Sequence, residues 1–178
     1  MSEAKHKIRE ARIEDFSQIK SLYQLVAKTT GGIARTEEEI TDSYIKRNLE
    51  NSLSNGVSLL VEDADSNTIV GEIHCYRLEP SVFSHVLSEL TIVIHPNHQG
   101  NGVGKMLFTE LLTSIKNGKH DVLRVELIAR ESNKRAITFY ESIGFVVEGR
   151  LEKRIKNPNG TFEADIPMAW FNNNYRGV

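Results

Sequence analysis

Apolar residues recur at strand or helix spacing along most of the chain, and the pattern predicts an alternation of elements. Strands are expected at residues 6–13, 57–62, 69–78, 87–95 and 122–129, with a final hairpin from 145–156 and 161–171. Helices are expected at 15–27, from 36 onward, at 103–116 and at 134–143. Hairpins dominate and two helices act as crossovers, which indicates a mixed, mostly antiparallel α/β sheet with helices on both faces.

Local signals set the ends of several of these elements. Thr36 and Glu39 have the spacing of a capping box, so the second helix should begin there. The segment 29–32 should break the first helix, and Gly118 should follow the end of the helix at 103–116. Pro167 lies inside the last strand, where it predicts an edge or a bulge.

Composition narrows the class of protein. The chain has 178 residues, 39% hydrophobic and 26% charged, which predicts a single domain over residues 1–178 with a core at about 7–170. The net charge of −2 gives no reason to expect a nucleic-acid partner. No apolar run approaches the ~20 residues of a membrane span, and residues 1–12 lack the apolar stretch of a secretory signal. A single cysteine, Cys75, excludes an internal disulfide, so a cytoplasmic protein with a buried thiol is expected.

A glycine-rich turn separates the strand at 87–95 from the helix at 103–116. Gly100, Gly102 and Gly104 remove three Cβ atoms from the turn at alternate positions. Backbone N–H groups can then converge on an anion at the start of a helix, where the helix dipole favours negative charge. The turn therefore predicts a binding site for a phosphate or pyrophosphate.

Two common phosphate-binding turns do not fit this segment. A Walker loop would need Gly at position 99 and Ser or Thr at 106, where the chain has Gln99 and Met106. A dinucleotide-binding turn that starts at Gly100 would need Gly or Ala where the chain has Lys105.

Two motifs in the right order instead resemble those of the GCN5-related N-acetyltransferase (GNAT) family. The run Gln99-Gly100-Asn101-Gly102-Val103-Gly104 is similar to its Gln/Arg-x-x-Gly-x-Gly/Ala turn, and Ile94-His95-Pro96 resembles the end of its fourth strand. The run from Asn133 to Phe145 resembles its second signature, Asn-x-x-Ala-x-x-x-Tyr-x-x-x-Gly-Phe. The resemblance extends from about residue 7 to 170.

The resemblance implies a fold whose fourth and fifth strands, here 87–95 and 122–129, splay apart to receive acetyl-CoA. The pyrophosphate would lie on the glycine turn, and the pantetheine arm would pair with the backbone of the fourth strand. The cofactor-binding residues that it implies are Ile92, Val93, Ile94, Gln99, Gly100, Asn101, Gly102, Val103, Gly104, Lys105 and Asn133.

The resemblance also implies an activity, the transfer of acetyl from acetyl-CoA to a primary amine by direct attack in a ternary complex. Tyr140 has the family position of the general acid that protonates the leaving thiolate. Glu89 is the candidate general base, with Glu72 and Glu126 as weaker candidates on central strands. A dedicated base is not required, because positioning alone supplies much of the rate.

Several readings stay open at this stage. A non-catalytic acyl-CoA-binding sensor, or transfer of an acyl group larger than acetyl, would suit the same fold. The acceptor could be a small molecule or a protein N-terminus, and a homodimer stays open. Glu37, Glu38 and Glu39 suit a helix start better than a cationic acceptor, while Gly31 and Gly32 could form a lip of the acceptor pocket.

Two other clusters near the motifs can be explained without a functional role. Lys134 and Arg135 could meet the 3′-phosphate of CoA or be solvated helix charges. His95 and His98 flank the glycine turn, but no third ligand stands at a suitable spacing, so no metal site is expected.

Overall fold

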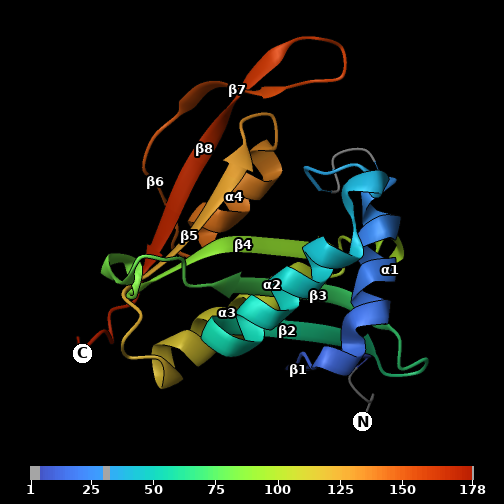
Figure 1. Cartoon of the computed structure of the whole chain (residues 1–178), viewed down its shortest axis with the longest axis horizontal. Coiled ribbons are helices and arrows are strands. Elements are labelled where there is room, and N and C mark those ends of the chain that lie inside the picture. Colours follow the sequence, from blue (N-terminus) through green and yellow to red (C-terminus); the bar gives the residue numbers. More distant parts are fainter. Residues whose placement is uncertain (1–4, 30–32, 178) are drawn as a thin grey trace. The chain divides into compact units, whose positions relative to one another are not determined.

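The computed structural model describes residues 5–29 and 33–177, and Figure 1 shows its helices and strands. The strands are β1 (His6–Glu10), β2 (Gly56–Asp63), β3 (Ile69–Tyr76), β4 (Val86–Ile94), β5 (Arg124–Arg130), β6 (Val146–Val147), β7 (Leu151–Lys156) and β8 (Phe162–Phe171). The α-helices are α1 (Phe16–Ala27), α2 (Asp42–Asn55), α3 (Val103–Gly118) and α4 (Lys134–Ser142). Short 3₁₀ turns are η1 (Ile13–Asp15), η2 (Glu37–Glu39), η3 (Ser81–Phe83) and η4 (Pro96–His98).

The strands follow the order β1-β2-β3-β4-β5-β8-β6, and β7 also pairs with β8. Antiparallel pairs are β1 with β2, β2 with β3, and β8 with each of β5, β6 and β7, whereas β4 and β5 are parallel. Within the described residues this parallel register covers Val86 with Arg124 and Leu87 with Val125, at the start of both strands. These features confirm the predicted mixed, mostly antiparallel α/β fold.

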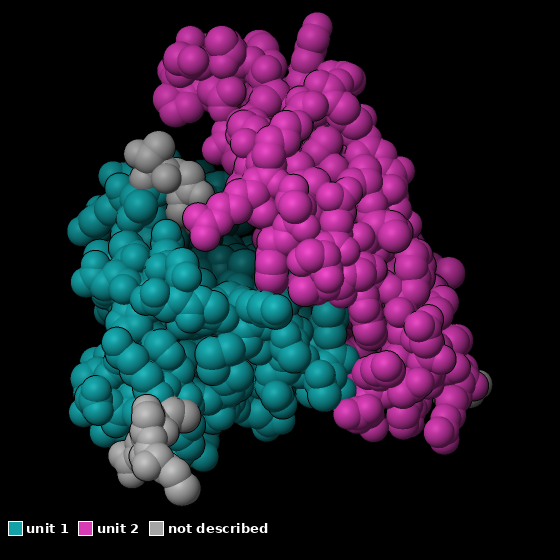
Figure 2. Space-filling view, turned by 180° about the vertical axis from the view of Figure 1, so that it is seen from behind, with its two compact units in different colours: residues 1–77, 91–114 teal, residues 78–90, 115–178 magenta. Residues whose placement is uncertain are grey.

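Two compact units make up the chain, and Figure 2 colours them separately. Unit 1 comprises residues 1–77 and 91–114, and unit 2 comprises residues 78–90 and 115–178. The single domain expected from the sequence stays a prediction.

In unit 1, helices cover both faces of the sheet. Figure 1 shows α1 and α2 in front of β2 and β3, and Tyr23 of α1 bonds to Glu72 of β3. Neighbouring residues of a strand point to opposite faces, so Gly71 faces the other way. There a Cβ on Gly71 would lie 3.2 Å from both Val103 and Leu107 of α3, so α3 covers the second face.

The predicted start of the second helix is wrong. The capping box of Thr36 and Glu39 does form, with a 2.7 Å hydrogen bond from Thr36 N to Glu39 Oε2, but it starts only the 3₁₀ turn η2. Ile40, 2% exposed in the core of unit 1, leaves the helical conformation with ψ of 69°. A second N-cap, Thr41, then accepts a hydrogen bond from Tyr44 N and starts α2.

In unit 2, the final hairpin differs from its predicted form. The strand expected at 145–156 is split into β6 and β7, with residues 148–150 outside both strands. Glu148 N donates to Pro167 O, and the N and O atoms of one strand residue point to the same side. The nitrogen of Pro167, which has no hydrogen to donate, therefore faces this interruption, as the expected irregularity requires.

Along β8, Ala164, Ile166 and Met168 are buried, while Phe162 at its start is 57% exposed. Gly118 is the last residue of α3, whereas the sequence predicted that it would follow the helix.

Among the described residues, no helix is long and apolar enough to cross a membrane. The lip proposed at Gly31 and Gly32 lies outside the described residues, as does most of the break at 29–32.

Candidate active site

Backbone and side-chain hydrogen bonds fix the conformation of the chain directly after β4. His95 N donates to Val70 O at 2.8 Å, which holds the end of β4 against β3. His95 Nδ1 then accepts from Asn97 N at 3.2 Å, and Pro96 starts η4. The amide of Gln99 donates to Ile94 O at 3.1 Å, so it ties the glycine turn back to the strand that precedes it.

Two of the three glycines require the left-handed backbone region. Gly100 has φ of 78° and Gly102 has φ of 81°, and a Cβ on either would meet no heavy atom within 4 Å. The space over the turn is therefore open and the backbone conformation selects glycine. Gly104 has no such φ, and a Cβ there would lie 3.8 Å from Ile92 Cδ1, an ordinary contact.

The turn leads directly into the N-terminus of α3. Met106 N donates to Gly102 O, the first bond of the helix. The N–H groups of residues 103–105 precede that bond and have no acceptor within the helix. The first turn of α3 carries no acidic residue, and Lys105 is exposed. This end of unit 1 can accept an anion.

The last residues of β4 alternate between the two faces of unit 1. Val93 is 1% exposed and packs with α1 and α2. Ile92 and Ile94 point the other way, since their Cδ1 atoms lie closest to the Cβ positions of Gly104 and Gly71. Their expected backbone contacts to acetyl-CoA stay a proposal.

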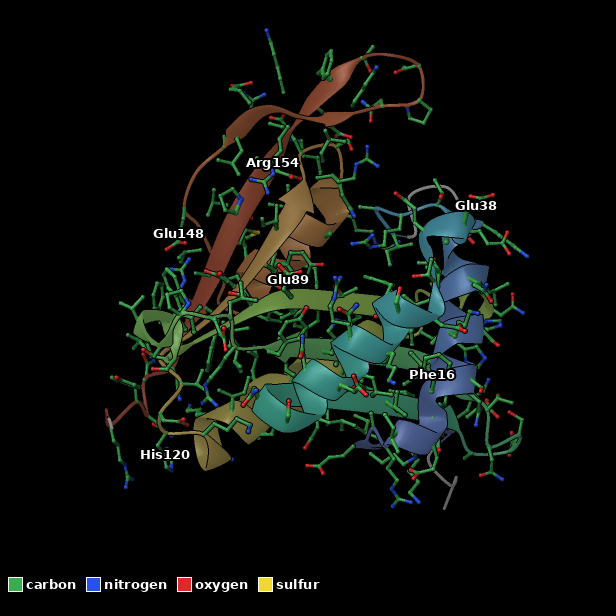
Figure 3. All side chains as sticks on the ribbon, viewed as in Figure 1. Phe16, Glu38, Glu89, His120, Glu148 and Arg154 are labelled. Atoms are coloured by element: carbon green, nitrogen blue, oxygen red, sulfur yellow. The ribbon has the colours of Figure 1, made fainter. Side chains whose placement is uncertain are left out.

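Glu89, in the part of β4 that belongs to unit 2, has an unusual backbone. It is exposed and has φ of 55°, a left-handed conformation in the middle of a strand. Figure 3 labels its side chain on β4. Such a conformation in a non-glycine residue costs about 1–3 kcal/mol and tends to mark functional positions.

The two weaker base candidates are held in structural networks. Glu72 is 2% exposed and accepts hydrogen bonds from Tyr23 at 2.6 Å and Ser58 at 3.1 Å. Glu126 accepts from Ser88 and from Arg124 Nε, the latter at 2.8 Å. Both carboxylates therefore have local bonding roles. A role of Glu89 as the general base stays a proposal.

In unit 2, α4 carries the second signature. Asn133 caps it through a 3.2 Å bond from Ala136 N to Oδ1. Gly144 has φ of 97° and ends the helix, which places Phe145 in the core at 2% exposed. The cap does not show whether Asn133 also contacts acetyl-CoA, so that contact stays a proposal.

Tyr140, on the last turn of α4, is half-buried. Its ring lies 5.7 Å from that of Phe139 and 6.0 Å from that of Phe145, between centroids. Burial raises the pKa of the Tyr140 phenol above its ordinary value. The phenol therefore keeps its proton at neutral pH, as a general acid must.

The structure also bears on the cysteine, the acidic run at 37–39 and the basic pair at 134–135. Cys75 is free and fully buried, as expected. The acidic run is used structurally: Glu37 pairs with Lys28 at 3.0 Å, and Glu39 caps η2. Lys134 and Arg135 are exposed, which leaves both of their interpretations standing.

The candidate residues thus fall into one group in each unit. Unit 1 holds the end of β4 and the glycine turn, while unit 2 holds Glu89, Asn133 and Tyr140. Sequence reasoning missed a cluster in unit 1 formed by His6, Asp63 and His98. His6 and Asp63 are too far from His98 in the sequence for any spacing rule to join them.

Comparisons with known proteins agree with the motifs. The model of the acetyltransferase (GNAT) family matches residues 19–145. A spermidine N(1)-acetyltransferase from Vibrio cholerae is 30% identical over 117 residues, 64% of this chain and 60% of the relative. An L-amino acid N-acyltransferase from Escherichia coli is 34% identical over 71 residues, 39% of this chain and 38% of the relative. The matches thus span only 60% and 38% of the lengths of these curated relatives.

A solved structure has the same fold. YncA from Salmonella typhimurium, solved with its cofactor acetyl-CoA, superposes with a TM-score of 0.79 at 18% identity, over 94% of both chains. Because the family model covers more than half of the chain, including the glycine turn and the whole second signature, the chain belongs to the GNAT acetyltransferase family.

Proposed function

We propose that this chain is an N-acetyltransferase that moves acetyl from acetyl-CoA to a primary amine by direct attack in a ternary complex. The observation that carries the proposal is the open glycine turn at the N-terminus of α3, where Gly100 and Gly102 leave the backbone uncovered. Family membership and the acetyl-CoA bound to YncA support the same substrate.

The turn suits the pyrophosphate of acetyl-CoA on three grounds. Its two left-handed glycines leave open space, the first turn of α3 has no carboxylate to repel an anion, and Lys105 is exposed beside it. Gln99 fixes the turn to β4, so the donors are held in place before the ligand arrives.

The transfer itself requires little covalent chemistry from the protein. The neutral amine attacks the thioester carbonyl, so a C–N bond forms and the C–S bond breaks. We assign to Tyr140 the proton that converts the leaving thiolate to a thiol, since its raised pKa keeps the phenol protonated. The proton lost by the amine passes to Glu89 or to water. Cys75 is fully buried, which supports transfer without an acyl-enzyme.

The acceptor is proposed as a small primary amine. The two curated relatives are named for spermidine and for L-amino acids, which share an amino group as the acetylated site. A protein N-terminus is the second class to test, and a cytoplasmic location and a homodimer remain proposals from the sequence.

The test is to incubate the chain with isotopically labelled acetyl-CoA and a panel containing spermidine, L-amino acids and peptides with free N-termini. Mass spectrometry should find label on the nitrogen of at least one amine, with an equal amount of free CoA. Binding of acetyl-CoA without any labelled amine would contradict the enzyme and favour an acyl-CoA-binding sensor. Faster turnover with a longer acyl-CoA would show that the donor is not acetyl-CoA, and the chain would still be an N-acyltransferase.

A further inference from the structure

Three potential metal ligands from distant parts of the sequence meet in unit 1. His6 starts β1, Asp63 ends β2 and His98 ends η4, and one ligand atom of each lies within 4.8 Å of the other two. All three belong to unit 1, outside the residues proposed for catalysis.

The fold fixes this meeting through backbone pairing. His6 and Asp63 are direct partners in the antiparallel register of β1 and β2, so their Cβ atoms lie about 4.5–5.5 Å apart. His98 arrives from β4, whose exit is held on β3 by the bond from His95 N to Val70 O. Formation of the sheet therefore brings the three side chains together without any help from a ligand.

The spacing of the two imidazoles suits one ion. His6 Nε2 and His98 Nδ1 are 3.2 Å apart. Two nitrogens bound to a tetrahedral zinc ion at ~2.0–2.1 Å are separated by about 3.3 Å. A shared proton also fits a gap of 3.2 Å, so a proton and a metal ion would compete for the same place.

The carboxylate of Asp63 is held ready. Its Oδ1 accepts hydrogen bonds from Asp65 N at 3.1 Å, Ser66 N at 3.0 Å and Ser66 Oγ at 3.0 Å. No hydrogen bond to Oδ2 forms within residues 5–29 and 33–177, which leaves this oxygen for an ion.

The environment also favours a bound ion. Asp63 is 8% exposed, and both histidines are half-buried. The ring of His95 packs edge-on against His98, with centroids 5.4 Å apart, and limits how far the His98 ring can turn.

We propose that His6, Asp63 and His98 bind a divalent transition-metal ion, with two imidazole nitrogens and one carboxylate oxygen as ligands and a fourth position left for water. This donor set suits Zn²⁺, and Ca²⁺ and Mg²⁺ prefer oxygen ligands. The ion joins the start of β1 to the residue directly before Gln99, so it also stabilises the segment that carries the glycine turn.

Isothermal titration of the metal-stripped full chain with ZnCl₂, and separately with CoCl₂, tests the proposal. One ion should bind per chain, and bound Co²⁺ should develop the intense visible bands of a four-coordinate site. His98→Ala and Asp63→Asn should each weaken Zn²⁺ binding at least about tenfold, a loss typical even of the outer partners of metal sites. His85→Ala, which changes a histidine of unit 2, should bind Zn²⁺ like the wild type.

Two further measurements keep the result clear. Ser66→Ala should weaken Zn²⁺ binding while leaving the Co²⁺ bands in place, because Ser66 only orients Asp63. Zn²⁺ should raise the melting temperature of the wild type and not that of His98→Ala, and circular dichroism verifies that each variant is folded. Failure to bind Zn²⁺, or equal binding by wild type and a folded His98→Ala, overturns the proposal.

Discussion

The side-chain amide of Gln99 donates a hydrogen bond to the backbone oxygen of Ile94 at 3.1 Å, and this bond closes the loop between β4 and the glycine turn. The residue that opens the glycine turn thus also fixes the turn to the last residue of β4. Shape and binding at this turn should therefore depend on the same side chain.

Replacing Gln99 by Ala should weaken acetyl-CoA binding with little effect on kcat. One neutral hydrogen bond contributes about 0.5–1.5 kcal/mol, which corresponds to a Kd raised roughly 2- to 12-fold. Titration calorimetry measures the change. Thr109→Ala, an exposed change on α3, serves as the control, and equal Kd values for Gln99→Ala and wild type would remove the role given to the side chain.

The glycines of the turn should differ in tolerance. Gly102→Val forces a branched residue to φ of 81° and fills the open space over the turn. The backbone strain is about 1–3 kcal/mol, and acetyl-CoA affinity should fall at least tenfold. Gly104→Ala should bind normally and gain up to ~1 kcal/mol of stability, because Ala suits a helix better than Gly. Equal effects of both substitutions on affinity would contradict this assignment.

The buried network around Glu72 should be structural and not catalytic. Tyr23 donates to Glu72 at 2.6 Å, and the two side chains are 1% and 2% exposed. Tyr23→Phe leaves a buried carboxylate short of one donor, so the free energy of unfolding should fall by about 1–3 kcal/mol. Urea denaturation measures it, with the partly exposed Tyr175→Phe as control. A loss of kcat without a loss of stability would show that Glu72 takes part in the reaction.

The ion pair of Arg9 and Asp15 should make the stability of the chain depend on pH in the acidic range. The guanidinium bonds both carboxylate oxygens, at 2.7 and 2.8 Å, and lowers the pKa of Asp15 below its ordinary value. Because the folded pKa is lowered, the contribution is complete at neutral pH and is lost as pH falls below about 3.9 toward the folded pKa. Asp15→Asn should therefore destabilise the chain at pH 7 but much less near pH 2. An equal loss of stability in Asp15→Asn at both pH values would show that the ion pair with Arg9 is not the cause.

Local sequence patterns predicted those parts of the site that neighbouring residues determine. The glycine turn and the helix that carries Tyr140 are set by residues a few positions apart, and both were predicted. The same reasoning placed the second helix at Thr36, because it could not weigh the burial of Ile40 against a local cap. The conformation of Glu89 also has no local signal, since its strand pattern continues unbroken.

Clusters built across strands were beyond prediction for a simple reason. Tyr23 and Glu72 are 49 residues apart, and His6 and His98 are 92 apart. Their meeting depends on how the helices and turns pack on the sheet and on strand register, which one sequence does not reveal. A metal-ligand search by spacing therefore stopped at His95 and His98, whereas the sheet supplies His6 and Asp63.

The most direct test of the central claim is thiol release from acetyl-CoA in the presence of the amine panel, comparing wild type with Tyr140→Phe across pH. The wild type should turn over at least one amine, with no loss of kcat from the acid group below about pH 10. Tyr140→Phe should bind acetyl-CoA normally and lose kcat by about 10²–10⁴-fold. Equal kcat in both proteins would remove Tyr140 as the acid, and a wild type that neither binds acetyl-CoA nor acetylates any amine would contradict the account.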